Sequence, residues 1–75
     1  MNLIGNNIKI IRKQIGLTRE ELALHIGVTP QAVSRWENGT GMPDISMVVP
    51  LAKTLNVSTD YLFGLEKNEI DDNVY

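Results

Sequence analysis

The sequence predicts an all-α fold, a compact bundle of five short helices. Apolar residues recur at the three- and four-residue spacing of helices, not in the alternation typical of a strand. Residues that cap helices stand before the apolar segments, and glycines follow most of them. The 75 residues suffice for one domain. A core of this size is marginal, so close helix packing or dimerisation is expected to help stabilise it.

The first helix is predicted over about residues 3–15. Its buried face is expected to consist of four isoleucines at helical spacing, Ile4, Ile8, Ile11 and Ile15. Asn2 can cap the start of this helix, and Gly16 is well placed to end it.

The second and third helices are separated by very few residues. Thr18 and Glu21 form a capping box that opens the second helix, and Gly27 ends it. Thr29 caps the third helix, and Pro30 takes its first position, where a missing amide costs nothing. The third helix is expected to end at about residue 38. Two helices joined by so tight a turn are typical of the helix-turn-helix motif, whose second helix enters a DNA major groove.

The last two helices are predicted over about residues 45–55 and 59–63. Asp44 caps the first of them, Ser58 caps the second, and Gly64 ends the chain of helices. Pro50 is unfavourable inside a helix, because an interior proline removes a backbone hydrogen bond and crowds the preceding turn, at a cost of about 3 kcal/mol. A kink or an irregular first turn is therefore expected in the fourth helix.

Two runs, GLTREELALHIGVTPQAVSRWENG and MPDISMVVPLAKTLNVSTDYLFG, resemble the Cro/phage-repressor (Xre-type) helix-turn-helix family. The resemblance covers residues 4–64 and rests on the Gly-Leu-Thr helix entry, the glycine turn and the Val-Ser-x-Trp-Glu-x-Gly run taken together. It implies a lambda-repressor-like five-helix fold. It further implies a transcriptional regulator, a repressor, that binds a pseudo-palindromic operator in double-stranded DNA as a homodimer.

Base contacts are expected on the outward face of the third helix. Val33 and Trp36 point toward the core, which leaves Gln31, Ser34 and Arg35 to contact bases. An arginine can pair with O6 and N7 of guanine, and a glutamine can pair with adenine or bridge to phosphate. Position 30 holds a proline where some relatives read a base through glutamine, so this chain has one polar reader fewer.

Phosphate contacts are expected from Arg19 and Thr29, which lie at helix N-termini, where backbone amides and side chains bind anions. The resemblance adds that Asn38 matches a phosphate-contacting position and that Arg12 and Glu37 match a structural ion pair between the first and third helices. The loop after residue 39 lacks the basic residues that many relatives place against DNA. Affinity is therefore expected to be modest or to depend strongly on dimerisation.

The dimer contact is expected from the fifth helix and the residues after it. If Leu62 faces inward, Tyr61, Phe63 and Leu65 remain as a weak interface between two copies. Residues 1–65 are accordingly predicted to be the DNA-binding domain, and residues 66–75 an acidic, flexible tail. Apolar residues within this tail leave open that it docks as a strand or helix.

Composition argues against several other classes. The net charge of −2 does not decide function, because the excess acid lies in the tail and the remainder is weakly basic. Without cysteine and with one histidine, no metal or other cofactor is expected. No nucleophile–base pair or phosphate loop points to an enzyme. No apolar run approaches the ~20 residues of a membrane helix, and the start lacks a signal peptide, so a cytoplasmic location is expected.

The main alternative is a protein-interaction module. A helix-turn-helix domain can dock a partner protein as its main task, as an antitoxin docks its toxin, and an acidic tail suits that role. Salt-dependent binding to duplex DNA distinguishes the two hypotheses.

Overall fold

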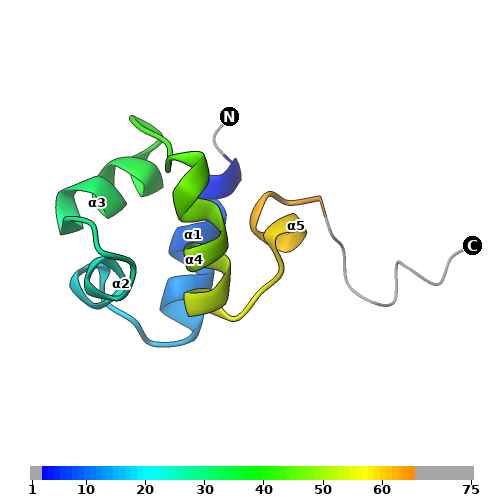
Figure 1. The fold of residues 1–75 in the computed structure, drawn as a ribbon, viewed down its shortest axis with the longest axis horizontal. Helices are drawn as coiled ribbons and strands as arrows, with labels where there is room; N and C mark the ends of the chain where they lie inside the picture. The colour runs from blue at the N-terminus through cyan, green and yellow to red at the C-terminus, as the bar shows by residue number, and fades with distance from the viewer. Residues whose placement is uncertain (1–2, 66–75) are drawn as a thin grey trace, which may run out of the picture.

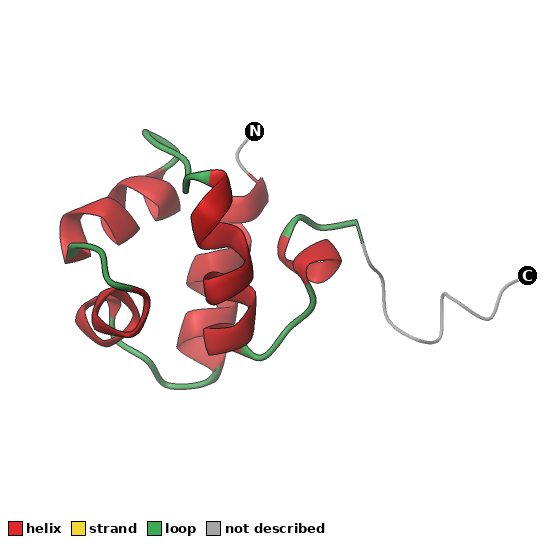
Figure 2. Ribbon diagram, in the orientation of Figure 1, coloured by secondary structure: helices red, strands yellow, loops and turns green. Residues whose placement is uncertain are grey.

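The computed structural model describes residues 3–65, which form five helices (Figure 1). They are α1 (Leu3–Gln14), α2 (Arg19–Ile26), α3 (Pro30–Asn38), α4 (Ile45–Leu55) and α5 (Thr59–Leu62). Residues 3–65 contain no strand (Figure 2), so the predicted all-α fold is confirmed. The predicted cap at Asn2 and the predicted tail over residues 66–75 lie outside the described residues. Within residues 3–65, no helix has the length and apolar character needed to span a membrane.

Helices α1 and α4 lie side by side at the centre of the molecule (Figure 1). On one side α3 packs against α1 and α2, and α2 also contacts α4; on the other side α5 contacts both central helices. The core between them consists of thirteen buried apolar residues: Ile4, Ile8, Ile11, Leu22, Ala23, Ile26, Val33, Trp36, Val48, Leu51, Ala52, Leu55 and Leu62. This packing fixes the α2–α3 pair against a rigid centre and leaves its outer face to solvent.

The end of α1 differs from the predicted isoleucine stripe. Ile4, Ile8 and Ile11 are buried as expected, but Ile15 is 47% exposed. The helix ends at Gln14, because Gly16 takes a left-handed φ of +80° and turns the chain away. The Ile15 amide still donates to the Ile11 carbonyl at 3.1 Å, so this residue closes the last turn of α1, where the chain leaves the core.

Helix α4 runs without interruption through Pro50. The sequence predicted a kink or an irregular first turn. Asp44 caps the helix, with its carboxylate accepting from the Ser46 amide at 3.1 Å, and the Met47 amide donates to the Asp44 carbonyl, three residues back, at 2.8 Å. Apolar side chains on the inner face hold the helix to the core, and this packing tolerates the missing hydrogen bond. Asn56 ends the helix in a left-handed conformation, with a φ of +62°.

Candidate nucleic-acid interface

Local sequence signals fix the junction between α2 and α3. Thr18 accepts a hydrogen bond from the Glu21 amide at 3.0 Å, and the Glu21 carboxylate accepts from the Thr18 amide at 2.8 Å. The predicted capping box is therefore present. Gly27 ends α2 with a φ of +78°, and its amide donates to the Ala23 carbonyl. The residues between the two helices are thus few, and both helix N-termini have a defined direction.

Helix α3 has one buried and one exposed face. Val33 and Trp36 are buried against the core. Gln31 and Arg35 are exposed and Ser34 is half-buried. Because positions three and four apart share a face of a helix, these three side chains form one outward surface. The predicted orientation of α3 is what the structure shows.

A shallow hollow joins the start of α2 to the start of α3. Its volume is about 230 Å³, and it is lined by Arg19, Glu20, Pro30, Gln31 and Ser34. The structure therefore brings one predicted phosphate-contacting residue together with two predicted base readers. Sequence reasoning missed the acidic residue at position 20. Its position next to Arg19 in the first turn of α2 is the sequence feature that could have indicated its place in this hollow.

The remaining predicted contacts lie around this hollow. Thr29 caps α3, where its hydroxyl oxygen accepts from the Ala32 amide at 3.1 Å. That bond leaves the hydroxyl proton able to donate to an anion. Asn38 is exposed at the opposite end of α3 and does not line the hollow.

Arg35 lies against the loop that follows α3. A Cβ atom placed on Gly41 would be 3.5 Å from the Arg35 Cβ and 3.8 Å from its Nε. The Thr40 hydroxyl also donates to the Arg35 carbonyl at 3.4 Å. The arginine stem is therefore supported by the loop, a contact that spacing along the sequence does not predict.

Glu37 is the centre of a charged cluster, formed with Arg12 and Arg19. Its Oε2 accepts from Arg12 Nε at 2.7 Å, and its Oε1 accepts from Arg12 Nη2 at 3.1 Å and from Arg19 Nε at 2.9 Å. Arg12 also donates from Nη1 to the Leu17 carbonyl at 2.8 Å. The side chain of Glu37 is only 1% exposed, that of Arg12 7% and that of Arg19 41%.

The electrostatics of the cluster favour the charged form of Glu37. Burial raises the pKa of the carboxyl group, but the hydrogen bonds and charges of Arg12 and Arg19 outweigh burial and hold this pKa below its usual value of 4.5. The structure thus brings Arg12 and Glu37 together, as the resemblance implied. It adds Arg19, so the carboxylate joins α1, α2 and α3.

The predicted dimer surface is less uniform than expected. Leu62 is fully buried, while Tyr61 and Leu65 are exposed. Phe63 is half-buried and packs against the core, so it offers less surface than the sequence suggested.

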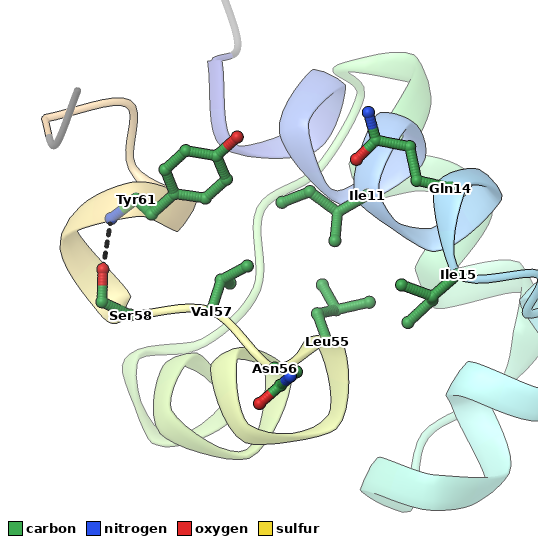
Figure 3. Close-up of a pocket in the computed structure, with 8 residues that line it drawn as sticks. All are labelled: Ile11, Gln14, Ile15, Leu55, Asn56, Val57, Ser58 and Tyr61. Atoms are coloured by element: carbon green, nitrogen blue, oxygen red, sulfur yellow. Dashed lines mark hydrogen bonds between the residues drawn. The ribbon is translucent and has the colours of Figure 1, made fainter. Parts of the chain in front are cut away.

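A groove of about 440 Å³ lies beside Tyr61. Figure 3 shows Ile11, Leu55 and Val57 pointing into it between α1, the end of α4 and α5. The half-exposed Ile15 also lines this groove, which accounts for the apolar side chain left outside the core. Among residues 3–65, no group of three or more His, Cys, Asp or Glu is arranged to hold a metal ion.

Comparison with known proteins places this geometry among regulators. The helix-turn-helix family model matches residues 8–62. The uncharacterized HTH-type transcriptional regulator YqaE of Bacillus subtilis is 36% identical over 67 residues, which cover 89% of this chain and 58% of that protein. The antitoxin PezA of Streptococcus pneumoniae is 35% identical over 72 residues, which cover 93% of this chain and 46% of PezA. The chain therefore spans about half the length of these curated relatives.

Solved structures show the same fold. The P22 c2 repressor in complex with a synthetic operator superposes with a TM-score of 0.80 at 30% identity, covering 88% of this chain and 100% of that chain. Hydroxypropylphosphonic acid epoxidase from S. wedmorenis superposes with a TM-score of 0.77 at 29% identity, covering 99% of this chain but 39% of the epoxidase. The similarity to the enzyme thus concerns a minor part of its chain.

Proposed function

This chain belongs to the helix-turn-helix family, and on that basis we propose that it is a sequence-specific DNA-binding transcriptional regulator, a repressor, that reads the major groove of double-stranded DNA with α3. The observation that carries the proposal is the shared exposed face of Gln31, Ser34 and Arg35 on α3. Gln31 and Ser34 also line the hollow between the capped N-termini of α2 and α3. The similarity to the P22 c2 repressor, whose structure contains operator DNA, supports it.

Each side chain of this face suits a different contact. Arg35 can donate two parallel hydrogen bonds to O6 and N7 of guanine, and Gln31 can pair with adenine in the same way. Ser34 has a hydroxyl that can donate to or accept from a neighbouring base. Base reading is therefore assigned to these three residues.

Phosphate binding is assigned to Arg19, Thr29 and Asn38. Arg19 and Thr29 stand at the N-termini of α2 and α3, where unpaired amides and the helix dipole favour an anion. Asn38 can donate from its amide at the far end of α3. These contacts would set the position of the protein on the duplex and leave sequence choice to the base readers.

The direct test is binding to random duplex DNA over a range of salt concentrations. Each phosphate contact releases counterions, so the logarithm of affinity should fall linearly with the logarithm of salt, by about 0.9 per contact. We expect measurable binding at about 50 mM salt and a steep loss by about 200 mM. Absence of binding to any duplex at low salt would contradict the proposal.

The second candidate is a protein-interaction module, and the similarity to the antitoxin PezA favours it. In that case the chain would dock a partner protein and bind DNA weakly or not at all. The acidic tail, which suits such docking by its charge, lies outside the described residues. The salt titration separates this candidate from the first.

Assembly and location complete the proposal. A weak homodimer through Tyr61, Phe63 and Leu65 would present two copies of α3 to a pseudo-palindromic operator. The exposure of Tyr61 and Leu65 supports this surface. Residues 1–65 form the proposed DNA-binding domain. The match to the helix-turn-helix family and to a named transcriptional regulator supports a cytoplasmic DNA-binding protein rather than an enzyme.

A further inference from the structure

Arg19 is held by one nitrogen only. Its Nε donates to Glu37 Oε1 at 2.9 Å, and among the described residues its two terminal nitrogens donate to no protein acceptor. The side chain is 41% exposed and lines the hollow shared with Gln31 and Ser34. The guanidinium is thus tied on its inner edge and open on its outer edge.

This single bond restricts the whole head group. A guanidinium is planar and has five N–H donors in a fixed fork, so fixing Nε limits where the terminal nitrogens can be. An exposed arginine otherwise loses considerable rotamer freedom when it binds a ligand. A side chain already held in place loses less.

The carboxylate that holds Arg19 is itself fixed. Arg12 contacts both oxygens of Glu37, and the Leu17 carbonyl fixes Arg12 in turn. Arg12 and Glu37 together carry no net charge, so the positive charge of Arg19 remains for a phosphate. A carboxylate without Arg12 would instead cancel that charge.

We infer that Glu37 is a positioning residue for DNA binding, which holds Arg19 by Nε so that its terminal nitrogens are left for a phosphate of the duplex. Arg12 serves the same purpose by fixing Glu37. The inference rests on the proposed DNA-binding function and gives the buried ion pair a role in that function. It also makes Arg19 a residue that lysine cannot replace.

The test compares Arg19→Lys with Arg19→Ala in duplex binding at fixed low salt. A lysine has one nitrogen, so its three N–H donors leave from a single point and cannot hold Glu37 on one edge while a separate edge faces the phosphate, as the planar fork does. We therefore expect Arg19→Lys to lose about tenfold in affinity, close to Arg19→Ala. Lys13→Ala, which removes an exposed cation at the end of α1, should change affinity less than about twofold.

The duplex affinities of the proteins with arginine and with lysine at position 19 are then compared in a Glu37→Gln background. Without the carboxylate, the lysine is released for phosphate, so its disadvantage relative to arginine should shrink to less than about threefold. Melting curves of all variants check that affinity is lost without unfolding. If Glu37→Gln does not fold, the comparison of lysine with alanine in the wild-type background decides alone.

The outcomes distinguish a failure of the positioning role from a failure of the proposed DNA binding. If wild-type protein binds DNA and Arg19→Lys binds as well as wild type, Arg19 supplies only charge and the positioning role is wrong. An unchanged affinity of Arg19→Ala would overturn the role as well. If the wild-type protein binds no duplex, the proposed function fails and the inference fails with it.

Discussion

Glu37 shows how much a single side chain can depend on its partners. Its carboxylate is buried, and a buried charge is tolerated only when it is paired and hydrogen-bonded. Resemblance to a family could pair Arg12 with Glu37. It could not add Arg19, because Arg19 and Glu37 are 18 positions apart in the sequence, a separation that no local spacing rule covers. Only the packing of α2 against α3 brings these two side chains together.

The first prediction concerns the coupling of Arg12 and Glu37. Alanine at either position leaves the other charge buried without its main partner, so each change should destabilise the protein by about 3 kcal/mol or more. The double variant should be less harmful than the sum of the two. Thermal or urea unfolding of the four proteins measures this. Strict additivity would show that the two residues act independently.

The second prediction concerns pH. The folded state lowers the pKa of Glu37, so the carboxylate stabilises the fold above about pH 4.5, and this contribution is lost as the pH falls through the lower, folded-state pKa. The melting temperature of Glu37→Gln should therefore fall less than that of wild type between about pH 6 and about pH 3. Glu20→Gln, in the exposed first turn of α2, is the charge-matched control. Equal pH dependence of wild type and Glu37→Gln would contradict the account.

At the scale of elements, the starts of the helices could be predicted better than the exposure of side chains at the end of α1. Caps at Thr18, Thr29, Asp44 and Ser58 are all present, because a cap is a local interaction between residues two or three apart. Burial of Ile15 could not be predicted in the same way. It depends on which other elements cover the last turn of α1, and Ile15 remains 47% exposed there although its amide still donates to the Ile11 carbonyl.

The third prediction tests the turn between α2 and α3. Gly27 has a left-handed φ of +78°, and a Cβ there would meet no atom within 4 Å. The cost of Gly27→Ala is thus conformational, about 1 kcal/mol, and Gly27→Asn should cost less, since asparagine tolerates this conformation. Gly41→Ala, whose Cβ would make an ordinary contact with Arg35, is the control and should be nearly neutral. Urea midpoints measure all three, and equal costs for alanine and asparagine at position 27 would contradict the explanation.

At the scale of the whole molecule, the arrangement of helices separates two surfaces. Helices α3 and α5 lie on opposite sides of the central α1–α4 pair (Figure 1). This arrangement is compatible with the proposed function, in which α3 contacts DNA while α5 contacts a second copy. The sequence predicted both surfaces. It could not predict how far Phe63 turns into the core, because this depends on the packing of α5 against α1 and α4.

The fourth prediction concerns assembly on DNA. A duplex with two half-sites one helical turn apart, about 34 Å, should bind at least about tenfold more tightly than a duplex with one. Leu65→Asp should remove this advantage and leave affinity for one half-site unchanged, because residue 65 is 74% exposed and follows α5, which packs on α1 and α4. Band-shift titration measures both. Equal affinity for the two duplexes, with only a one-protomer complex, would rule out the dimer.

The central claim is that α3 reads the base sequence, and selection of bound sites from a random duplex library tests it most directly. Wild-type protein should select a motif with two related halves. Arg35→Ala should lose preference at one position in each half, a discrimination worth about 1–3 kcal/mol, while Arg19→Ala should select the wild-type motif with lower affinity. Selection of the full wild-type motif by Arg35→Ala would contradict the claim.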